Sequence, residues 1–338
     1  MRRSDRLHDA RRYEVLAAVY GREDRRVTAE NVGAYRTKVE KAGEWLYISC
    51  YPLITAGARR EQEAKLAELE QEISEGRSKI RRQWAKYNNA RRTLEFEKLV
   101  HANFGRGDLH VCCTYEVVDY ERSGEADYRS REDAKREIRN YIARVKRLLK
   151  RHECDLNEFR WIICTVTKEG MKEAYNPRPD THHHHLLFHG VPEVLRGKVE
   201  DLWEFGTCNA DRLQPSSDKG VAAMAGYIAR QEGNANGERA GEKSYSCSRN
   251  IVRPEARVSD VKISRRRVAK IAADVRRDGR EIFEQVWSEY RMAEAPVVKV
   301  SDFTAGAYIY ARMRIKDGEG DRLKGGTKKY GKGTGKLV

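Results

Sequence analysis

The sequence lacks any long apolar run. None of its stretches approaches the roughly 18 consecutive apolar residues that a membrane-spanning helix needs, although the chain has 338 residues. The first residues, MRRSDRLHDARRYEVL, are positively charged, but no apolar segment follows them. We therefore expect neither a signal peptide nor a transmembrane span.

Paired cysteines are missing as well. The seven cysteines are odd in number and scattered, and none forms a C-x-x-C motif. This pattern argues against a disulfide framework and against a structural zinc site, and it suits a reducing cytoplasm. A nucleotide-driven motor is not evident either. The segment GTKKYGKG at 326–333 misses the phosphate-loop pattern, because Gly follows Lys332 and no room remains for a helix behind it.

Basic charge is what the sequence has in excess. Lys and Arg total 67 against 52 Asp and Glu, a formal net charge of +15. Such a balance favours a polyanionic partner, and nucleic acid above all, because Lys and Arg gain affinity by displacing counterions from phosphates. A solvated basic surface is the alternative. The length allows two or three units of ordinary size.

Three regions are predicted along the chain. Residues 1–105 read as a mixed segment, with the buried strand WLYISCYPLI at 45–54, followed by a helical or coiled-coil-like stretch. Gly76 is expected to bend that stretch or to separate two helices. Residues 261–338 read as a basic helix, a small β-hairpin unit and a Gly- and Lys-rich tail after Asp317, which we expect to be mobile.

The middle region, 106–260, alternates between strands and helices. Strands are indicated at 109–118, 159–168 and 207–214 and at the histidine run, and helices at 130–151, 191–203 and 218–231. The order β-α-β-β-α-β-α predicts an α+β fold, a small antiparallel sheet with helices on one face. It resembles the ferredoxin-like or RNA-recognition fold.

Four consecutive histidines stand in DTHHHHLLFHG at 180–190. In a strand, residues two apart point to one face, so His183 and His185 can reach one ion while His184 points to the face of Leu186 and Phe188. The alternative pair, His182 and His184, would put the ion on the buried side. Parity therefore favours His183 and His185, and a cluster without any ligand is the remaining alternative.

Two imidazoles leave a divalent ion short of ligands. An acidic side chain from a neighbouring strand would complete a site suited to Mg²⁺ or Mn²⁺. The strand at 159–168 ends beside the histidine strand if the two pair antiparallel. Glu169 is therefore the candidate third metal ligand, with Glu173 in reserve.

Tyr227 lies in the predicted helix 218–231, with Arg230 one turn later, and both lie to one side of its core-facing stripe. A phenol can attack a phosphodiester if a metal polarises the phosphate and a nearby cation balances the charge. Tyr245 is a second candidate nucleophile. A purely structural role for Tyr227 is the alternative.

These elements together resemble the rolling-circle replication initiators of the HUH endonuclease superfamily, in the single-tyrosine group of phages and plasmids. The two-histidine motif is matched by residues 183–188, the upstream acidic ligand by Glu169, and the nucleophile motif Tyr-x-x-Lys by Tyr227 to Arg230, with Arg in place of Lys. Conjugative relaxases place the tyrosine before the histidines. The order here favours an initiator or a single-tyrosine transposase, and the length favours the initiator.

The resemblance implies a metal-dependent DNA endonuclease and strand transferase. Tyr227 would join the 5′ phosphate of single-stranded origin DNA and leave a 3′-hydroxyl primer, with the ion held by His183, His185 and Glu169. A host helicase and DNA polymerase would be its partners in a bacterial cytoplasm. The expected contacts to the DNA backbone are Arg249, Arg265, Arg266, Arg267 and Lys270. Two alternatives stay open, a non-catalytic basic nucleic-acid-binding protein and a zinc-dependent hydrolase.

Overall fold

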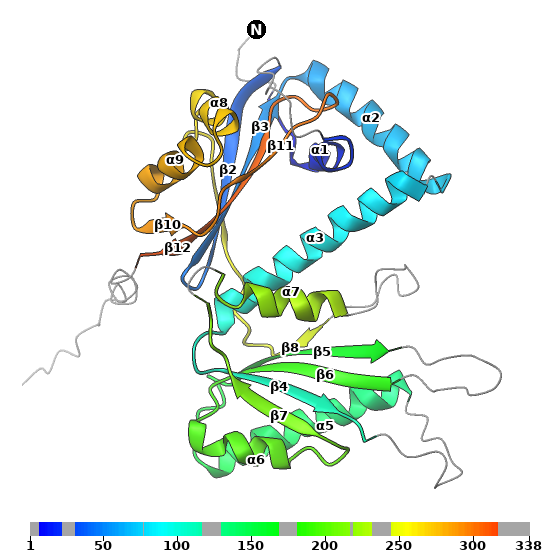
Figure 1. Ribbon diagram of the computed structural model, residues 1–338, viewed down its shortest axis with the longest axis vertical. Coiled ribbons are helices and arrows are strands. Elements are labelled where there is room, and N and C mark those ends of the chain that lie inside the picture. The colour runs from blue at the N-terminus through cyan, green and yellow to red at the C-terminus, as the bar shows by residue number, and fades with distance from the viewer. Residues whose placement is uncertain are drawn as a thin grey trace, which may run out of the picture. The chain divides into compact units, whose positions relative to one another are not determined.

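The computed structural model describes residues 7–21, 31–76, 78–116, 130–168, 181–216, 219–231 and 245–316. The chain divides into two compact units (Figure 1). Unit 1 consists of residues 1–71 together with 255–338, and unit 2 of residues 72–254. This division differs from the three predicted regions, because the two ends of the chain build one unit. The physical reason is strand pairing. Strands near the C-terminus, 256–259 and 308–315, pair with the two edges of the N-terminal hairpin formed by 32–42 and 45–54.

Unit 1 contains a seven-stranded antiparallel sheet in the order β10-β12-β3-β2-β9, with β1 paired to β3 and β11 paired to β12. The strand predicted at 45–54 is β3, at the centre of this sheet. The predicted C-terminal β-hairpin is no separate unit, because β12 pairs with β3 from Ile309↔Cys50 to Arg314↔Trp45. The elements of unit 1 are β1 His8–Asp9, η1 Arg11–Tyr13, α1 Glu14–Tyr20, β2 Val32–Ala42, β3 Trp45–Ile54, most of α2 Ala56–Ser74, β9 Ala256–Ser259, α8 Arg265–Ala273, α9 Asp278–Val286, β10 Tyr290–Met292, β11 Val297–Lys299 and β12 Tyr308–Ile315.

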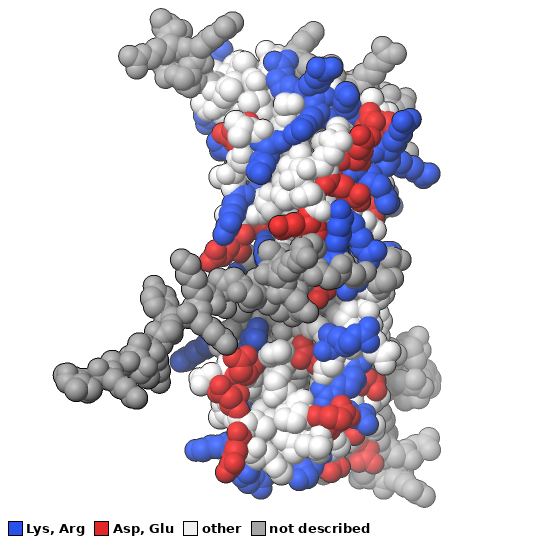
Figure 2. All heavy atoms as spheres, turned by 90° about the vertical axis from the view of Figure 1, so that its left-hand side faces the viewer, with Lys and Arg blue, Asp and Glu red and all other residues white. Residues whose placement is uncertain are grey.

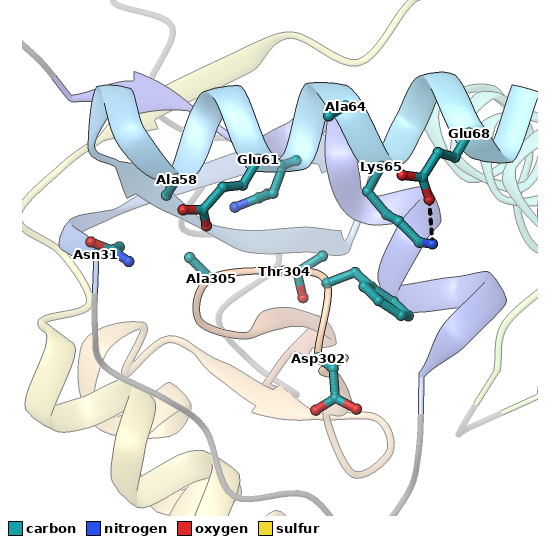
Figure 3. A pocket seen from close by; sticks show the side chains of 11 residues that line it. Asn31, Ala58, Glu61, Ala64, Lys65, Glu68, Asp302, Thr304 and Ala305 are labelled. Carbon is teal, nitrogen blue, oxygen red and sulfur yellow. Dashed lines mark hydrogen bonds and ion pairs between the residues drawn. The ribbon is translucent and has the colours of Figure 1, made fainter.

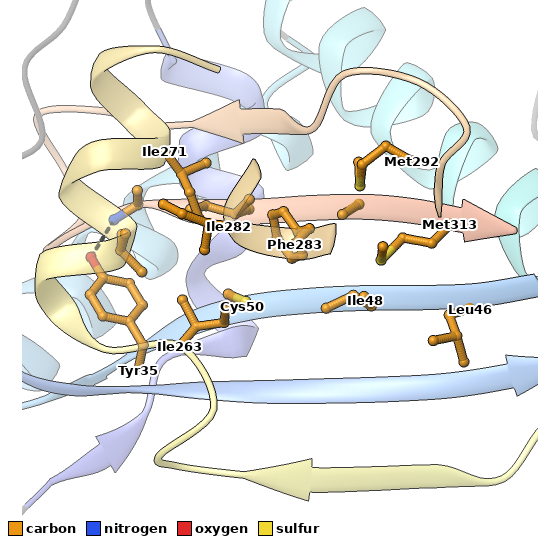
Figure 4. Close-up of a cluster of buried hydrophobic side chains, with 14 of the residues drawn as sticks. Tyr35, Leu46, Ile48, Cys50, Ile263, Ile271, Ile282, Phe283, Met292 and Met313 are labelled. Carbon is orange, nitrogen blue, oxygen red and sulfur yellow. Dashed lines mark hydrogen bonds between the residues drawn. The ribbon is translucent and has the colours of Figure 1, made fainter. Parts of the chain in front are cut away.

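The main core of unit 1 lies between the sheet and the helices α8 and α9 (Figure 4). Ile271 and Phe283 from these helices are buried against Ile48 and Met313 from the central strands. A buried polar contact fixes one end of this core, where the backbone N–H of residue 307 donates to the Tyr35 hydroxyl at 3.0 Å. The basic helix predicted after residue 260 is thus two helices with an apolar side, and its cations lie on the other side.

Gly76 lies between α2 and α3 (Ser78–Asn103), which is the second of the two outcomes expected from the sequence, a bend or a separation into two helices. Its φ of +77° lies in the left-handed region, which Gly adopts without the steric cost that a Cβ would bring. The helical stretch at 58–104 is therefore a pair of helices. Within the described residues, no helix is both long enough and apolar enough to cross a membrane.

Unit 2 is built on a five-stranded antiparallel sheet in the order β7-β4-β6-β5-β8. The α+β class and the antiparallel pairing agree with the sequence prediction. The elements of unit 2 are α3, β4 Leu109–Thr114, α5 Arg131–Arg151, β5 Arg160–Lys168, β6 Thr181–His189, η2 Glu193–Leu195, α6 Arg196–Asp201, β7 Cys208–Arg212, α7 Ala222–Gln231 and β8 Ser246–Cys247.

Helices lie on both faces of this sheet, so the prediction of helices on one face is wrong (Figure 1). On one face, α5 and α6 bury Ile138 and Val199 against Leu186 and Phe188 of β6. On the other face, α3 and α7 bury a second apolar cluster that includes Leu187. The physical reason is that α3, assigned from the sequence to the N-terminal region, packs with α7 on unit 2. The second cluster does not contain His183 or His185.

Candidate active site

The histidines of β6 alternate between the two faces of the unit 2 sheet. His184 is fully buried on the face of α5 and α6. Its Nε2 lies 3.0 Å from the Tyr115 hydroxyl, and its Nδ1 lies 2.9 Å from the Thr165 hydroxyl. Burial is the main cause that lowers the pKa of His184 to about 3, with the neighbouring histidines adding to it. Both ring nitrogens are therefore engaged within the protein.

His182 lies on the same buried face as His184. It is buried, and its Nδ1 lies 3.0 Å from the Thr167 hydroxyl. An ion bound by His182 and His184 would have to break these hydrogen bonds in a desolvated interior. The packing therefore disfavours the alternative register and leaves His183 and His185 as the pair that can share an ion.

His183 and His185 lie together on the opposite face. Their ring centroids are 5.2 Å apart, and the centroid of the Tyr227 ring lies 5.8 Å from that of His185. Tyr227 belongs to α7, whose Ala225 and Ile228 are buried in the apolar cluster, whereas its own ring is half-exposed at 50%. The fold thus brings together three residues that the sequence analysis selected separately.

His110 of β4 joins this group, although the sequence analysis did not select it. Its Nε2 lies 3.2 Å from Nδ1 of His185, and the two ring planes differ by only 15° with centroids 5.3 Å apart. These values describe an edge-to-edge hydrogen bond. Burial lowers the pKa of His110, and the charge of Asp211 on the neighbouring strand opposes that shift. The alternation in LHVCCT contained a signal, since His110 has polar neighbours two residues away, but the strand register was not known.

Two cysteines flank His185 on the adjacent strands. Cys112 of β4 and Cys164 of β5 are its cross-strand partners. Nevertheless, among the residues that the structure describes, no group of three His, Cys, Asp or Glu side chains could hold a metal ion. The predicted third ligand Glu169 and its reserve Glu173 lie outside the described residues. The donor set of the described site is thus the two imidazoles, which suit a divalent ion that takes further ligands from elsewhere.

The remaining predicted residues are distributed over both units. Arg230 lies in α7 one turn after Tyr227, and its side chain is outside what the structure describes. Arg249 is exposed after β8 in unit 2. The other four predicted DNA contacts are exposed on α8 of unit 1, and Figure 2 shows many Lys and Arg side chains on the side of the unit that carries α8. These four are Arg265, Arg266, Arg267 and Lys270. The tail after Asp317, with the phosphate-loop-like segment, lies outside the described residues.

A hollow of about 520 Å³ lies in unit 1 beside α2. Figure 3 shows Glu61, Lys65 and Glu68 of this helix facing the loop that carries Asp302. Lys65 pairs with Glu68 at 2.6 Å and lies over the Phe303 ring. Carboxylates and a cation are mixed here without a clear preference for one charge, so we assign no ligand to this hollow.

Comparison with models of protein families, with curated proteins and with solved structures finds no match. The chemistry of the site is thus the basis for assigning a function. In the group formed by His110, His183, His185 and Tyr227, a tyrosine lies beside imidazoles.

Proposed function

We propose that the protein is a metal-dependent DNA strand transferase. It nicks and rejoins single-stranded origin DNA through a 5′-phosphotyrosine, as the resemblance to HUH replication initiators implies. The observation that carries the proposal is the position of the Tyr227 ring, 5.8 Å from the ring of His185 on the face that His185 shares with His183. A nucleophile beside a potential metal pair is what phosphoryl transfer to tyrosine requires.

His183 and His185 would hold the divalent ion, and Glu169 is the proposed third ligand. A bound Mg²⁺ or Mn²⁺ supplies polarisation of the scissile phosphate and stabilisation of its developing charge. His110 supports this role as a positioning residue. By holding Nδ1 of His185 at 3.2 Å it fixes the orientation of the ring and leaves Nε2 for the ion.

Tyr227 performs the covalent step. Its phenolic oxygen forms a bond to phosphorus, the phosphorus–O3′ bond breaks, and the proton lost from the phenol is balanced by one gained at the 3′ oxygen. One phosphodiester replaces another, so the step is reversible and needs no ATP. Because the ring is half-exposed, a DNA strand can approach its hydroxyl group from solvent. Arg230, one turn later, would balance the charge of the transferred phosphate.

The sheet face beside the site offers a place for the strand. Thr114, Asn209 and Asp211 are exposed on β4 and β7, and by register they lie on the face of His110 and His185. Amide, hydroxyl and carboxylate groups can donate to or accept from the edges of unstacked bases. A host helicase would supply the single strand, and a host polymerase would extend the 3′-hydroxyl.

The test uses the full chain with Mn²⁺ and a pool of single-stranded fragments that tile the genetic element encoding it. Wild type is expected to form a denaturation-resistant protein–DNA adduct, and Tyr227→Phe is expected to form none. Tyr245→Phe is the matched control, because Tyr245 packs on Phe96 in the same unit, and it should retain the adduct. Absence of any wild-type adduct, or an adduct that survives in Tyr227→Phe, would refute the proposal. Cleavage without a covalent species would identify a hydrolase.

A further inference from the structure

Helix α5 carries a one-sided basic surface. Between Glu137 and Glu153 the sequence contains no acidic residue and six cations. Apart from Ala143, the apolar residues of this stretch are buried against the sheet, so the cations occupy the opposite side of the helix. We name the basic surface by its members, which are Arg139, Arg144, Lys146, Arg147, Lys150 and Arg151.

The basic surface contains a hollow suited to an anion. A depression of about 580 Å³ is lined by Leu202 and by four of the cations, Arg144, Arg147, Lys150 and Arg151. Arg144 binds Glu204 through Nη1 at 2.7 Å, while its Nε and Nη2 are buried without a hydrogen-bond partner among the described residues. Burying such donors costs free energy, and an anionic oxygen that accepted from them would offset that cost. Within the part of the chain that the structure describes, Arg147, Lys150 and Arg151 form no ion pair with a carboxylate.

We infer that the basic surface of α5 binds the phosphate backbone of double-stranded DNA. Duplex DNA presents phosphates outward and keeps its bases stacked, so it is bound by cations without aromatic partners. Proteins that hold single strands add aromatic side chains on which bases stack. The exposed residues of α5 from 139 to 151 are five of the six cations with Asn140 and Ala143, whereas Arg144 is partly buried, and none of these residues is aromatic. The rings beside the surface, Phe205 and Trp161, are themselves partly buried and lie under Arg144 and Lys146. This composition favours the duplex.

Helix α3 provides the contrast within the same unit. It is also basic, but none of its residues from 79 to 95 is buried, so its cations point in all directions. Trp84 and Tyr87 stand among them with ring centroids 6.4 Å apart. A helix that is polar on all sides forms no single phosphate-binding row. The one-sided row is a feature of α5.

The two DNA forms would use opposite faces of the sheet. α5 packs on the face of Leu186 and Phe188, whereas His183, His185 and Tyr227 lie on the other face. The sheet therefore separates the cations of α5 from Tyr227. The inference goes beyond the proposed function, because it assigns a duplex-binding surface that chemistry at Tyr227 does not need.

The experiment measures binding, with no nicking required. Fluorescence anisotropy titrates the full chain against a 30-base-pair duplex and a 12-nucleotide single strand, both of arbitrary sequence, over a range of salt concentrations. The test variant is Arg147→Gln/Lys150→Gln/Arg151→Gln, and the matched control is Arg81→Gln/Lys86→Gln/Arg91→Gln on α3. Both remove three exposed cations from a helix of unit 2, and Gln keeps helix propensity close to that of Lys and Arg.

We expect the α5 variant to lose about tenfold or more in duplex affinity at moderate salt, with the salt slope reduced by up to about 2.7, since each neutralised duplex phosphate contributes about 0.9. Its single-strand affinity should match that of the α3 variant. If both variants lost the same affinity for the duplex, the loss would reflect the lower net charge alone, and the inference would be wrong. An equal loss for single strand and duplex in the α5 variant would overturn the duplex assignment. Thermal melting checks that both variants are folded.

Discussion

His184 and His185 are neighbours in the chain and both are buried, yet they lie on opposite faces of the unit 2 sheet and have different partners. Both nitrogens of His184 meet hydroxyl groups of the protein in a closed apolar layer. Nδ1 of His185 lies within hydrogen-bond distance of Nε2 of His110, and the ring of His185 meets the half-exposed Tyr227. His184 is enclosed by the core, whereas buried His185 lies beside a tyrosine that solvent reaches.

The same contrast separates two tyrosines. Tyr141 of α5 is fully buried and donates its hydroxyl hydrogen to the Val199 carbonyl at 3.0 Å. Tyr227 of α7 is half-exposed beside the histidine pair. We call the face under α5 and α6 the closed face and the face under α3 and α7 the partly covered face. Hydrogen-bonded polar groups on the closed face stabilise the fold, whereas the partly covered face leaves polar groups available for chemistry. Substitutions on the two faces should therefore affect different measurements.

The largest effect is expected from the histidine pair. His183→Ala and His185→Ala should each lower adduct formation by about 100-fold or more, because each removes a metal ligand. Mn²⁺ binding, measured by electron paramagnetic resonance, should fall in parallel. His189→Ala is the control on the same strand and face, since His189 binds Asp108 at 2.8 Å. If both variants bound Mn²⁺ like wild type, the proposal that His183 and His185 hold the ion would be wrong.

On the closed face, stability should respond instead. His184→Ala deletes a fully buried ring with two hydrogen bonds and leaves a cavity beside Trp203. We expect a loss of about 2–4 kcal/mol in the free energy of unfolding. Urea unfolding in EDTA measures it, with His183→Ala, on the partly covered face, expected to lose less than about 1 kcal/mol. Equal losses at the two positions would contradict the contrast between the faces.

The histidine alternation was predictable from the sequence, and the reason is local. A strand repeats every two residues, so Leu186 and Phe188 identified the buried face and assigned His184 to it. Leu187 is apolar on the other face, and the structure buries it under α3 and α7. One apolar residue in the run DTHHHHLLFHG was thus a sign that helices cover part of both faces.

Features that depend on long-range pairing were not predictable. The position of His110 beside His185 follows from the register of β4 against β6, which pairs His110 with Leu187. The union of the two chain ends follows from pairing of β12 with β3, more than 250 residues apart along the chain. Local pattern gives each strand and its buried side, but it does not give the partner strand. The α3 helix illustrates the same limit, since its periodicity did not reveal which sheet it covers.

The closed face also predicts a dependence of stability on pH. The pKa of His184 is about 3 in the folded protein against 6.5 when exposed, so below pH 6.5 the unfolded chain binds a proton that the folded chain excludes. The contribution of neutral His184 to the free energy of unfolding is complete above pH 6.5 and is lost as the pH falls toward 3. Relative to His184→Ala, wild type in EDTA should lose about 1.4 kcal/mol per pH unit in this window. If the free energy of unfolding changed with pH in the same way in wild type and in His184→Ala, the lowered pKa would not belong to His184.

A smaller effect is expected at the residue that positions His185. His110→Ala should weaken Mn²⁺ binding about tenfold, because the ring of His185 loses the hydrogen bond that orients it. Calorimetric titration measures the affinity. Cys112→Ala is the control, since Cys112 is the cross-strand partner of His185 on the same strand as His110. If both variants bind Mn²⁺ like wild type, the hydrogen bond does not serve the metal.

The smallest effect comes from single hydroxyl groups, and it separates the two faces most directly. Tyr141→Phe leaves the buried Val199 carbonyl without its donor, so we expect a loss of about 1–2 kcal/mol in the free energy of unfolding. Tyr227→Phe removes the same atom from a half-exposed ring and should change stability by less than about 0.5 kcal/mol, while abolishing the adduct. Urea unfolding and the adduct assay on both variants give opposite rankings if the faces differ as described. A stability loss in Tyr227→Phe as large as in Tyr141→Phe would mean that Tyr227 is a packing residue.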